Sequence, residues 1–305
     1  MGRRRQQRGR DVHGILMFDK PAGLSSNAAL QEVKRLYFAK KAGHTGSLDP
    51  LATGLLPICF GHATRVSSFL LDADKSYEVV CKLGVTTTTA DAEGEVLQTR
   101  PVANLTREQI NRLLQEKFSG AISQVPPMHS ALKHKGQRLY ELARQGIEVE
   151  REPRQVEIHE IDCTAVDTDT VSVRVRCSKG TYIRTLIEDI GEVLGCGAHV
   201  TQLRRTAVSP FESPEMVTLQ QLEELKRTDR PAMDGLLLPI TSALQAYPDI
   251  HLSADAAFYM RQGQAVQVPR APADGWVRLY QNDHEFIGMG VVQDDGKIAP
   301  KRLFS

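Results

Sequence analysis

Hydrophobic residues recur along the chain at the spacings of both strands and helices. Short apolar or alternating runs predict strands at residues 15–18, 77–83, 156–161 and 172–177. Apolar stripes predict helices from Ser26, over residues 185–194 and over residues 218–227. A further helix should begin at Thr106, because Gln109 lies where it completes a capping box. The chain therefore mixes both types of element.

A change in composition near residues 229–249, which hold three prolines, predicts a domain boundary there. Beyond it a helix should follow Ser253 and end at Gly263, and short strands should cover residues 276–280, 286–293 and 297–299. Short strands in a small unit favour a small barrel. A chain of 305 residues is long enough for two domains.

The composition is ordinary for a folded protein, with 41% hydrophobic and 25% charged residues, and it excludes wholesale disorder. No apolar run approaches the roughly 18 residues of a membrane helix, so we expect no membrane association. The five cysteines are widely spaced, with no C-x-x-C motif and no cluster with histidine. They predict reduced thiols in a cytoplasmic protein and give no support for a metal site.

The net charge is only +1, but the first 50 residues hold 10 Lys and Arg against 4 Asp and Glu. Arginines 3, 4, 5, 8 and 10 begin this excess. No apolar segment follows them, so the pattern is not typical of a signal peptide. Two readings stay open, a solvated terminus and an arm that binds nucleic acid.

The most informative segment is the run GHTGSLDPLATG at residues 43–54. Pro50 keeps Asp49 out of helical geometry, and glycines constrain the loop on both sides. From the residues alone, Asp49 is either a turn former that caps backbone N–H groups or a positioned nucleophile or base.

Three further segments carry basic residues that are either solvated or functional. Arg184 follows the run CSKGTYI at residues 177–183, and a cation there would keep a nearby carboxylate ionised. The pair Arg204 and Arg205 suits phosphate contact. Residues 133–154 combine several bases with Tyr140, which fits a loop that embraces RNA; its candidate contacts are Lys133, Arg138 and Arg144.

Together these segments carry a family resemblance. The chain resembles the TruB-type tRNA pseudouridine-55 synthases of bacteria at residues 19–26, 43–61, 63–65, 178–184 and 203–206. The resemblance spans residues 12–305. It favours the functional reading of Asp49, because a dozen ordered residues around it do not arise from generic loop composition.

The resemblance implies an α+β fold in two parts. Residues 12–247 would form a pseudouridine synthase catalytic domain around a mixed, largely antiparallel sheet, with an insertion at about 125–152 that closes over RNA. Residues 248–305 would form a small PUA-like β-barrel that touches the acceptor end of tRNA, and residues 1–11 a basic flexible tail.

The resemblance also implies roles for individual residues. Asp49 matches the essential aspartate, Arg184 the arginine that pairs with it, and Tyr77 the aromatic that packs on the target base. His44 matches a residue placed where the RNA loop is opened. Positions that line the substrate pocket are matched by Lys20, Tyr182 and Leu203.

The implied reaction isomerises uridine 55 in the T-loop of tRNA. It breaks the N1–C1′ bond, turns the base and joins C5 to C1′, so neither electrons nor groups are exchanged and no cofactor, metal or ATP is expected. The flipped nucleotide must leave its stack. Whether Asp49 attacks C1′ or removes a ribose proton, and whether Tyr77 moves a proton, stay open.

We expect a monomer that acts on tRNA without an obligate protein partner. Two rival functions share much of this sequence pattern. One is an RNA chaperone that remodels tRNA without chemistry. The other is a guide-RNA-dependent pseudouridine synthase, which needs partner proteins; the basic insertion favours stand-alone recognition instead.

Overall fold

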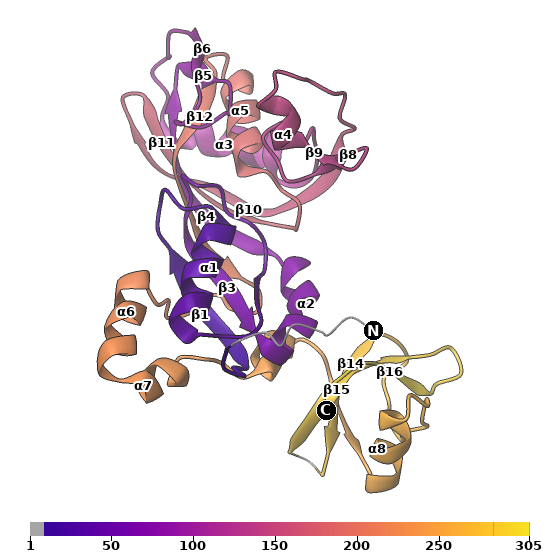
Figure 1. Cartoon of the computed structure of the whole chain (residues 1–305). Helices are drawn as coiled ribbons and strands as arrows, with labels where there is room; N and C mark the ends of the chain where they lie inside the picture. Colours follow the sequence, from indigo (N-terminus) through magenta and orange to yellow (C-terminus); the bar gives the residue numbers. More distant parts are fainter. Residues whose placement is uncertain (1–8, 283, 305) are drawn as a thin grey trace.

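The centre of the molecule is an eight-stranded sheet. A computed structural model describes residues 9–282 and 284–304, and in it the strands follow the order β1-β3-β12-β4-β11-β10-β7, with β2 paired to β3 (Figure 1). Neighbouring strands are antiparallel except β3 and β12, which are parallel. The prediction of an α+β domain around a mixed, largely antiparallel sheet is confirmed.

The elements of this first and larger part have the following bounds. Its sheet contains β1 (Gly14–Lys20), β2 (Ala42–His44), β3 (Thr53–Phe60), β4 (Lys75–Leu83), β7 (Gly120–Gln124), β10 (Arg154–Asp167), β11 (Thr170–Cys177) and β12 (Ala198–Val208). Two small hairpins pair β5 (Val85–Thr87) with β6 (Val96–Thr99) and β8 (Lys133–His134) with β9 (Gln137–Arg138). The helices are α1 (Ser26–Tyr37), α2 (Ser67–Leu71), α3 (Arg107–Phe118), α4 (Leu139–Ala143), α5 (Ile183–Val193), α6 (Leu219–Thr228) and α7 (Arg230–Gly235), with the 3₁₀ turns η1 (Gly61–Arg65) and η2 (Ile240–Leu244).

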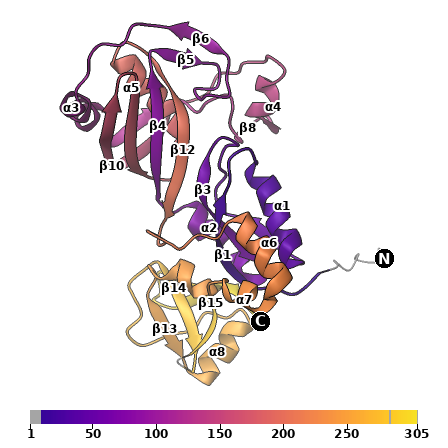
Figure 2. The same cartoon turned by 90° about the vertical axis from the view of Figure 1, so that its left-hand side faces the viewer.

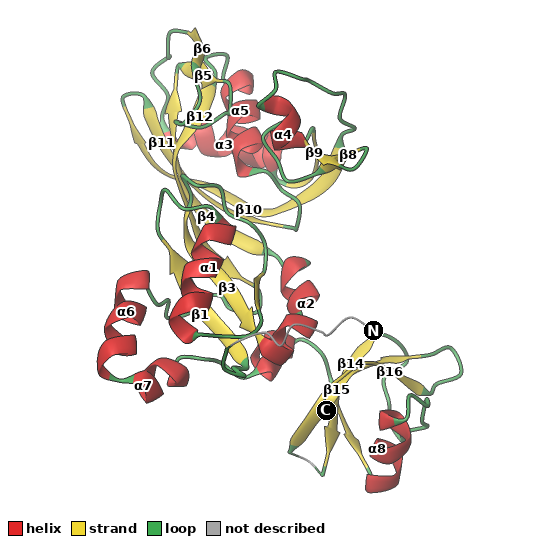
Figure 3. Cartoon of the chain, viewed as in Figure 1, coloured by secondary structure: helices red, strands yellow, loops and turns green. Residues whose placement is uncertain are grey.

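The helices begin close to their predicted positions. Thr106 and Gln109 form the expected capping box at the start of α3. The cap of α1 is Ser25, one residue before the predicted one, because the Ser26 hydroxyl binds the backbone of Leu48 instead. The helices lie on the sheet in Figure 3, where α3 and α5 cover one half and α1 the other. Among the described residues, no helix is long and apolar enough to cross a membrane.

Two long strands were not predicted. The strand β3 contains Gly54 and Pro57, which read as loop residues, yet seven of its eight positions are buried. β12 was recognised only as a motif at residues 203–206. β3 lies inside the sheet, where burial on two faces removes the alternation that identifies a strand. In β12, buried polar residues such as His199 and Arg205 conceal the alternation of buried and partly exposed positions.

The C-terminal unit is an open sheet with one helix. Its strands β13 (Asp249–Leu252), β14 (Trp276–Gln281), β15 (Glu285–Val292) and β16 (Ile298–Leu303) pair in chain order, beside α8 (Ala254–Arg261). The described residues form no closed barrel, so the barrel prediction is not confirmed. The predicted boundary near residue 248 stays a prediction.

The C-terminal unit contacts the larger part near α2. The Arg302 guanidinium lies over the rings of Phe69 and Trp276, at 5.4 and 6.0 Å from their centroids. Arg65 Nη1 in turn donates to the carbonyl oxygen of Leu303 at 2.6 Å. Figure 2 shows this unit at the end of the molecule opposite the β5–β6 hairpin.

The predicted basic tail of residues 1–11 falls only partly within the described residues. Residues 1–8, with four of the five arginines, lie outside the described residues. Arg10 is no free tail residue, because its guanidinium pairs with Asp234 and its backbone bonds to Phe38 and Lys40.

All five cysteine side chains are buried. Burial raises the pKa of the Cys59 and Cys81 thiols to about 12 and that of Cys177 to about 11. They therefore pack as small apolar side chains.

Gly54 allows β3 and β12 to approach each other, and this contact gives a stability prediction. A Cβ atom at Gly54 would lie 2.2 Å from the carbonyl oxygen of Arg205, and the φ angle is +97°. Gly54→Ala should lower the free energy of unfolding by more than about 3 kcal/mol, measured by chemical denaturation. The matched control is Gly120→Ala, whose φ is +80° with no atom within 4 Å of the added Cβ. It should cost only about 1–2 kcal/mol. Equal losses in the two variants would show that the close approach is unimportant.

Candidate active site

Three buried polar side chains hold the loop that carries Asp49. The Ser26 hydroxyl accepts from the Leu48 N–H at 2.7 Å and donates to the Leu48 carbonyl at 2.9 Å. Lys20 Nζ donates to the carbonyl oxygens of Leu24 at 2.7 Å and Pro50 at 3.4 Å. Arg205 Nη2 donates to the Gly46 carbonyl at 3.1 Å. Because each contact is to main chain, the loop is fixed on both sides of Asp49.

Arg184 lies in the first turn of α5 and binds two carboxylates. Its Nε is 2.9 Å from Asp49 Oδ2, and its Nη1 is 3.4 Å from Asp91 Oδ2. Nη1 also donates to the carbonyl of Thr89 at 2.9 Å, and Nη2 to that of His129 at 2.8 Å. The Arg184 side chain is only 6% exposed. A cation at a helix N-terminus opposes the helix dipole, so the two carboxylates offset that cost. The expected ion pair between Asp49 and Arg184 is present.

The carboxylate of Asp49 is crowded by protein but reaches a cavity. Its side chain is 40% exposed, whereas that of Asp91 is 3% exposed. Burial raises the pKa of Asp49, the Arg184 charge lowers it, and the negative charge of Asp91 raises it again. The net direction is upward. An ionised Asp49 is therefore a more basic carboxylate than one in water, while Arg184 keeps it from being neutralised completely.

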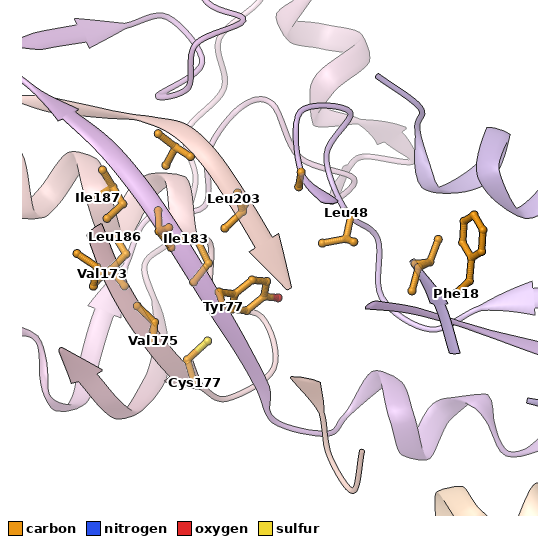
Figure 4. Close-up of a cluster of buried hydrophobic side chains, with 14 of the residues drawn as sticks. Phe18, Leu48, Tyr77, Val173, Val175, Cys177, Ile183, Leu186, Ile187 and Leu203 are labelled. Carbon is orange, nitrogen blue, oxygen red and sulfur yellow. The ribbon is translucent and has the colours of Figure 1, made fainter. Parts of the chain in front are cut away.

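The cavity beside Asp49 has a volume of about 600 Å³. Its walls include the predicted residues Tyr77, Tyr182 and Leu203. In Figure 4, Tyr77 lies near Leu203 and Ile183, and Leu48 approaches from the opposite side. Cavities of this size hold small organic ligands. The cavity thus combines an aromatic wall with the partly exposed carboxylate of Asp49.

The Arg205 side chain, a predicted RNA contact, is buried in the cavity lining rather than presented at the surface. The residue is 1% exposed, and its Nε donates to the carbonyl of Leu55 at 2.7 Å. Burial lowers the pKa of Arg205, and a hydrogen bond with the Tyr77 hydroxyl raises it. Arg205 therefore connects the Asp49 loop to Tyr77 from below the cavity.

Two other predicted pocket residues do not line this cavity. Lys20 is fully buried under the loop, where burial lowers its pKa to about 8. His44 ends β2, and its Nδ1 is buried without a hydrogen-bond partner among the described residues. Burial lowers the pKa of His44, so a neutral ring is favoured. The Lys20 ammonium therefore contacts the backbone of the loop and not the cavity.

The insertion places only some of its predicted bases at the site. Arg144 and Tyr140 line the cavity, and the Arg144 guanidinium lies 5.5 Å from the Tyr140 ring centroid. Arg138 lies 5.8 Å from the same centroid on exposed β9. Lys133 is exposed on β8, away from the cavity lining. Arg138 and Arg144 thus both lie against the Tyr140 ring.

Arg204, the neighbour of Arg205, is already paired. Its Nη1 and Nη2 donate to the two carboxylate oxygens of Asp19 at 3.0 and 2.8 Å. Its side chain is 38% exposed. A phosphate contact by Arg204 would have to compete with this bidentate pair.

Sequence reasoning missed Asp91 and Lys75. Asp91 ends the run TTTTAD at residues 86–91, where a carboxylate after hydroxyl side chains was the available signal. Its Oδ1 accepts from Thr89 Oγ1 at 2.5 Å. Lys75 lines the cavity two residues before Tyr77, and its Nζ donates to the Leu71 carbonyl at 3.0 Å, at the end of α2. Burial lowers the pKa of Lys75 to about 8.

The chain matches known proteins over nearly its full length. Residues 34–183 match the N-terminal domain of the TruB family pseudouridylate synthases. Residues 184–245 match the tRNA pseudouridylate synthase B C-terminal domain, and residues 248–304 match the C-terminal region of pseudouridine synthase II TruB. A tRNA pseudouridine synthase B of Nitrosococcus oceani is 57% identical over 99% of this chain and 98% of its own length. The chain belongs to the TruB family of pseudouridine synthases. Members of this family are isomerases.

Other comparisons agree with this TruB family assignment. A tRNA pseudouridine synthase B of Stutzerimonas stutzeri is 58% identical over 96% of each chain. Among solved structures, an archaeal box H/ACA Nop10–Cbf5 complex aligns with a TM-score of 0.71 at 24% identity, covering 97% of this chain and 87% of that one. A Cbf5–Nop10–Gar1 complex aligns at 0.73 and 26%, covering 96% and 84%. The fold is therefore that of pseudouridine synthases.

The raised pKa of Asp49 predicts a cost in stability for this TruB-family chain. The folded state holds the Asp49 proton more tightly than the unfolded state. The protonated carboxyl therefore adds to the free energy of unfolding at low pH, and this gain is lost as the pH rises through the folded-state pKa. Asp49→Asn should therefore have a higher Tm than the unaltered chain at pH 8, by about 1–3 °C because solvent reaches the carboxylate. The difference should shrink at pH 5. Asp19→Asn, which breaks the pair with Arg204, should show no such gain. A lower Tm of Asp49→Asn at pH 8 would contradict the direction of this pKa shift.

Proposed function

We propose that this protein isomerises uridine 55 in the T-loop of tRNA to pseudouridine, with Asp49 as the catalytic carboxylate. The relatives that support this proposal are named tRNA pseudouridine synthase B and share more than half of its residues over almost the whole chain. The observation that carries it is the contact of 2.9 Å between Arg184 Nε and Asp49 at the wall of the cavity. We assign the roles below to residues in that wall.

The reaction needs one carboxylate that is ionised near neutral pH and held against the ribose of a flipped nucleotide. Arg184 favours the ionised form of Asp49. The product has the same atoms as the substrate, since the N1–C1′ bond breaks and a C5–C1′ bond forms. C5 loses its proton to a base and N1 gains one, so the proton count is unchanged. The carboxylate is either a nucleophile that leaves C1′ again or a base that removes a ribose proton, which is later returned. Either route uses the same partly exposed Asp49.

Tyr77 supplies the surface on which we place the target base. It is 7% exposed and lines the cavity, so burial holds the ring in the cavity wall. Burial raises the pKa of Tyr77, which favours the neutral phenol. Stacking on an aromatic ring contributes about 1–3 kcal/mol per base and offsets part of the energy of unstacking the nucleotide.

The insertion and the C-terminal unit are our candidates for the rest of the RNA contact. Arg138 and Arg144 flank Tyr140, an arrangement suited to phosphates and to a stacked base. We assign His44 to the opening of the T-loop, because it is a largely buried imidazole on the strand that leads into the Asp49 loop. We place the acceptor end of tRNA on residues 248–304.

The guide-RNA-dependent alternative is the weaker one. The Cbf5 chains with the same fold are described in complexes with Nop10 and Gar1, but they are only 24–26% identical to this chain. The tRNA pseudouridine synthase B chains are 57–58% identical. We therefore expect the purified chain to act on naked tRNA without a partner.

The direct test uses purified protein, an unmodified tRNA transcript and EDTA, with pseudouridine mapped by carbodiimide treatment and primer extension. A single stop at uridine 55 is expected. Asp49→Asn should abolish this stop while the Kd for the transcript stays within about tenfold, because the side chain keeps its size and loses only its charge. Turnover that survives in Asp49→Asn would refute the catalytic assignment.

The same variant separates catalysis from RNA remodelling. If the unaltered chain binds the transcript and refolds it but leaves no stop, the chaperone reading replaces the proposed enzyme. If a stop appears only after Nop10-like partner proteins and a guide RNA are added, the partner-dependent reading replaces it.

Asp49 and Asp91 share Arg184, and this arrangement predicts how Asp91→Asn changes the pH dependence of activity. Activity should fall as the pH falls through the pKa of Asp49, because the protonated carboxyl cannot act. Asp91→Asn removes a negative charge that raises this pKa, so its acidic limb should move to lower pH. Its plateau rate should fall about 10- to 100-fold, because Arg184 loses one of its two carboxylates. Single-turnover rates between pH 5 and 8 measure both effects, with Asp19→Asn as the control. An acidic limb that stays in place or moves to higher pH would contradict the assigned charges.

A further inference from the structure

A buried glutamine ties the insertion to the helix that carries Arg184. Gln124 is the last residue of β7 and is 1% exposed. Its side-chain Nε2 donates to the carbonyl oxygen of Tyr182 at 3.2 Å, and its Oε1 accepts from the Tyr182 N–H at 3.1 Å. One side-chain amide therefore binds both polar backbone groups of a single residue 58 positions away.

The residue it holds is the N-cap of α5. Tyr182 has extended backbone geometry and makes no capping bond with its own side chain. A helix end without a cap leaves backbone groups that need other partners. Gln124 supplies such a partner for the Tyr182 N–H. Because Arg184 follows only two residues later, the direction of its side chain depends on the backbone that Gln124 fixes.

Gln124 also lies where the insertion leaves the sheet and returns to it. In the β7–β10 ladder it pairs with Arg154, the first residue of β10. The segment between these two residues contains His129, whose carbonyl oxygen accepts from Arg184 Nη2 at 2.8 Å. The insertion thus contacts the arginine directly through His129 and indirectly through Gln124 and Tyr182.

We propose that Gln124 is a positioning residue for the ion pair of Arg184 and Asp49. It does not line the cavity. It sets where α5 begins relative to the base of the insertion, so that Arg184 Nε meets Asp49 at the distance that keeps the carboxylate ionised. This inference rests on the proposed synthase activity of the same site.

The chain contains a matched control for this amide. Asn111 of α3 binds the backbone of Cys163 in the same way, with Nδ2 donating to the carbonyl at 3.3 Å and Oδ1 accepting from the N–H at 2.7 Å. This second clamp joins α3 to β10, and neither residue lines the cavity. Asn111→Leu therefore removes the same pair of bonds without touching α5.

The test compares Gln124→Met with Asn111→Leu on the tRNA transcript. Both variants should lose thermal stability. Gln124→Met should also lower kcat at least tenfold with KM within about threefold, because a misplaced group costs rate more than affinity. Its acidic limb should move to higher pH, since a looser Arg184 favours the ionised Asp49 less. Asn111→Leu should have the same kcat and the same acidic limb of the pH profile as the unaltered chain.

A second variant keeps the test informative if Gln124→Met does not fold. In Gln124→Glu the introduced carboxyl can donate to the Tyr182 carbonyl and accept from its N–H only when it is protonated. The kcat of Gln124→Glu, divided by that of the unaltered chain, should therefore rise as the pH falls from 8 to 5.5. A structural role unrelated to Arg184 would leave this ratio flat.

The outcomes separate this inference from the proposed function. No pseudouridine with the unaltered chain refutes the proposed function itself. An active unaltered chain, with Gln124→Met matching Asn111→Leu in kcat and acidic limb, refutes the positioning role alone. A flat ratio for Gln124→Glu also refutes it.

Discussion

The guanidinium of Arg184 is the interaction on which the site depends. A buried cation is tolerated only when its charge is paired and its N–H groups are bonded. Here Nε binds Asp49, Nη1 binds Asp91 and the Thr89 carbonyl, and Nη2 binds the His129 carbonyl. Four separate segments of the chain therefore meet at one side chain. Two carboxylates against one guanidinium leave an excess of negative charge, and the partly exposed Asp49 is the one that presents it to the cavity.

Beneath that pair, charged and polar side chains act on the backbone rather than on a ligand. Lys20, Ser26 and Arg205 bind carbonyl or N–H groups of the Asp49 loop, and each is almost completely buried. Such bonds are stronger in a medium of low dielectric constant and are costly to break without replacement. A loop rich in glycine thereby gains the rigidity of a strand. This explains how Lys20 and Ser26 can belong to the same functional pattern as Asp49 without lining its cavity.

The sequence could predict five helices, α1, α3, α5, α6 and α8, and the strands β1, β4, β10, β11, β14, β15 and β16, because periodicity and caps are local signals. The pairing of Asp49 with Arg184 followed from the family resemblance. The sequence could not predict β3, whose Gly54 and Pro57 look like loop residues until β1, β2 and β12 surround them. For the same reason Lys20 and Arg205 were expected at the cavity or the RNA, although both are buried. A positive charge in a motif does not reveal whether its partner is a phosphate or a carbonyl. Asp91 and Gln124 act through residues distant in sequence, which only the fold brings near.

The burial of the five cysteines determines how the protein responds to oxidants and alkylating reagents. A thiol becomes a nucleophile only as the thiolate, and burial in apolar surroundings suppresses that form. Oxidants and alkylating reagents can therefore modify Cys59, Cys81 or Cys177 only after local or global unfolding exposes them. The rate at which a thiol reagent modifies these side chains therefore reports how often the central sheet opens. The folded enzyme carries its thiols through oxidative conditions without needing a disulfide to protect them.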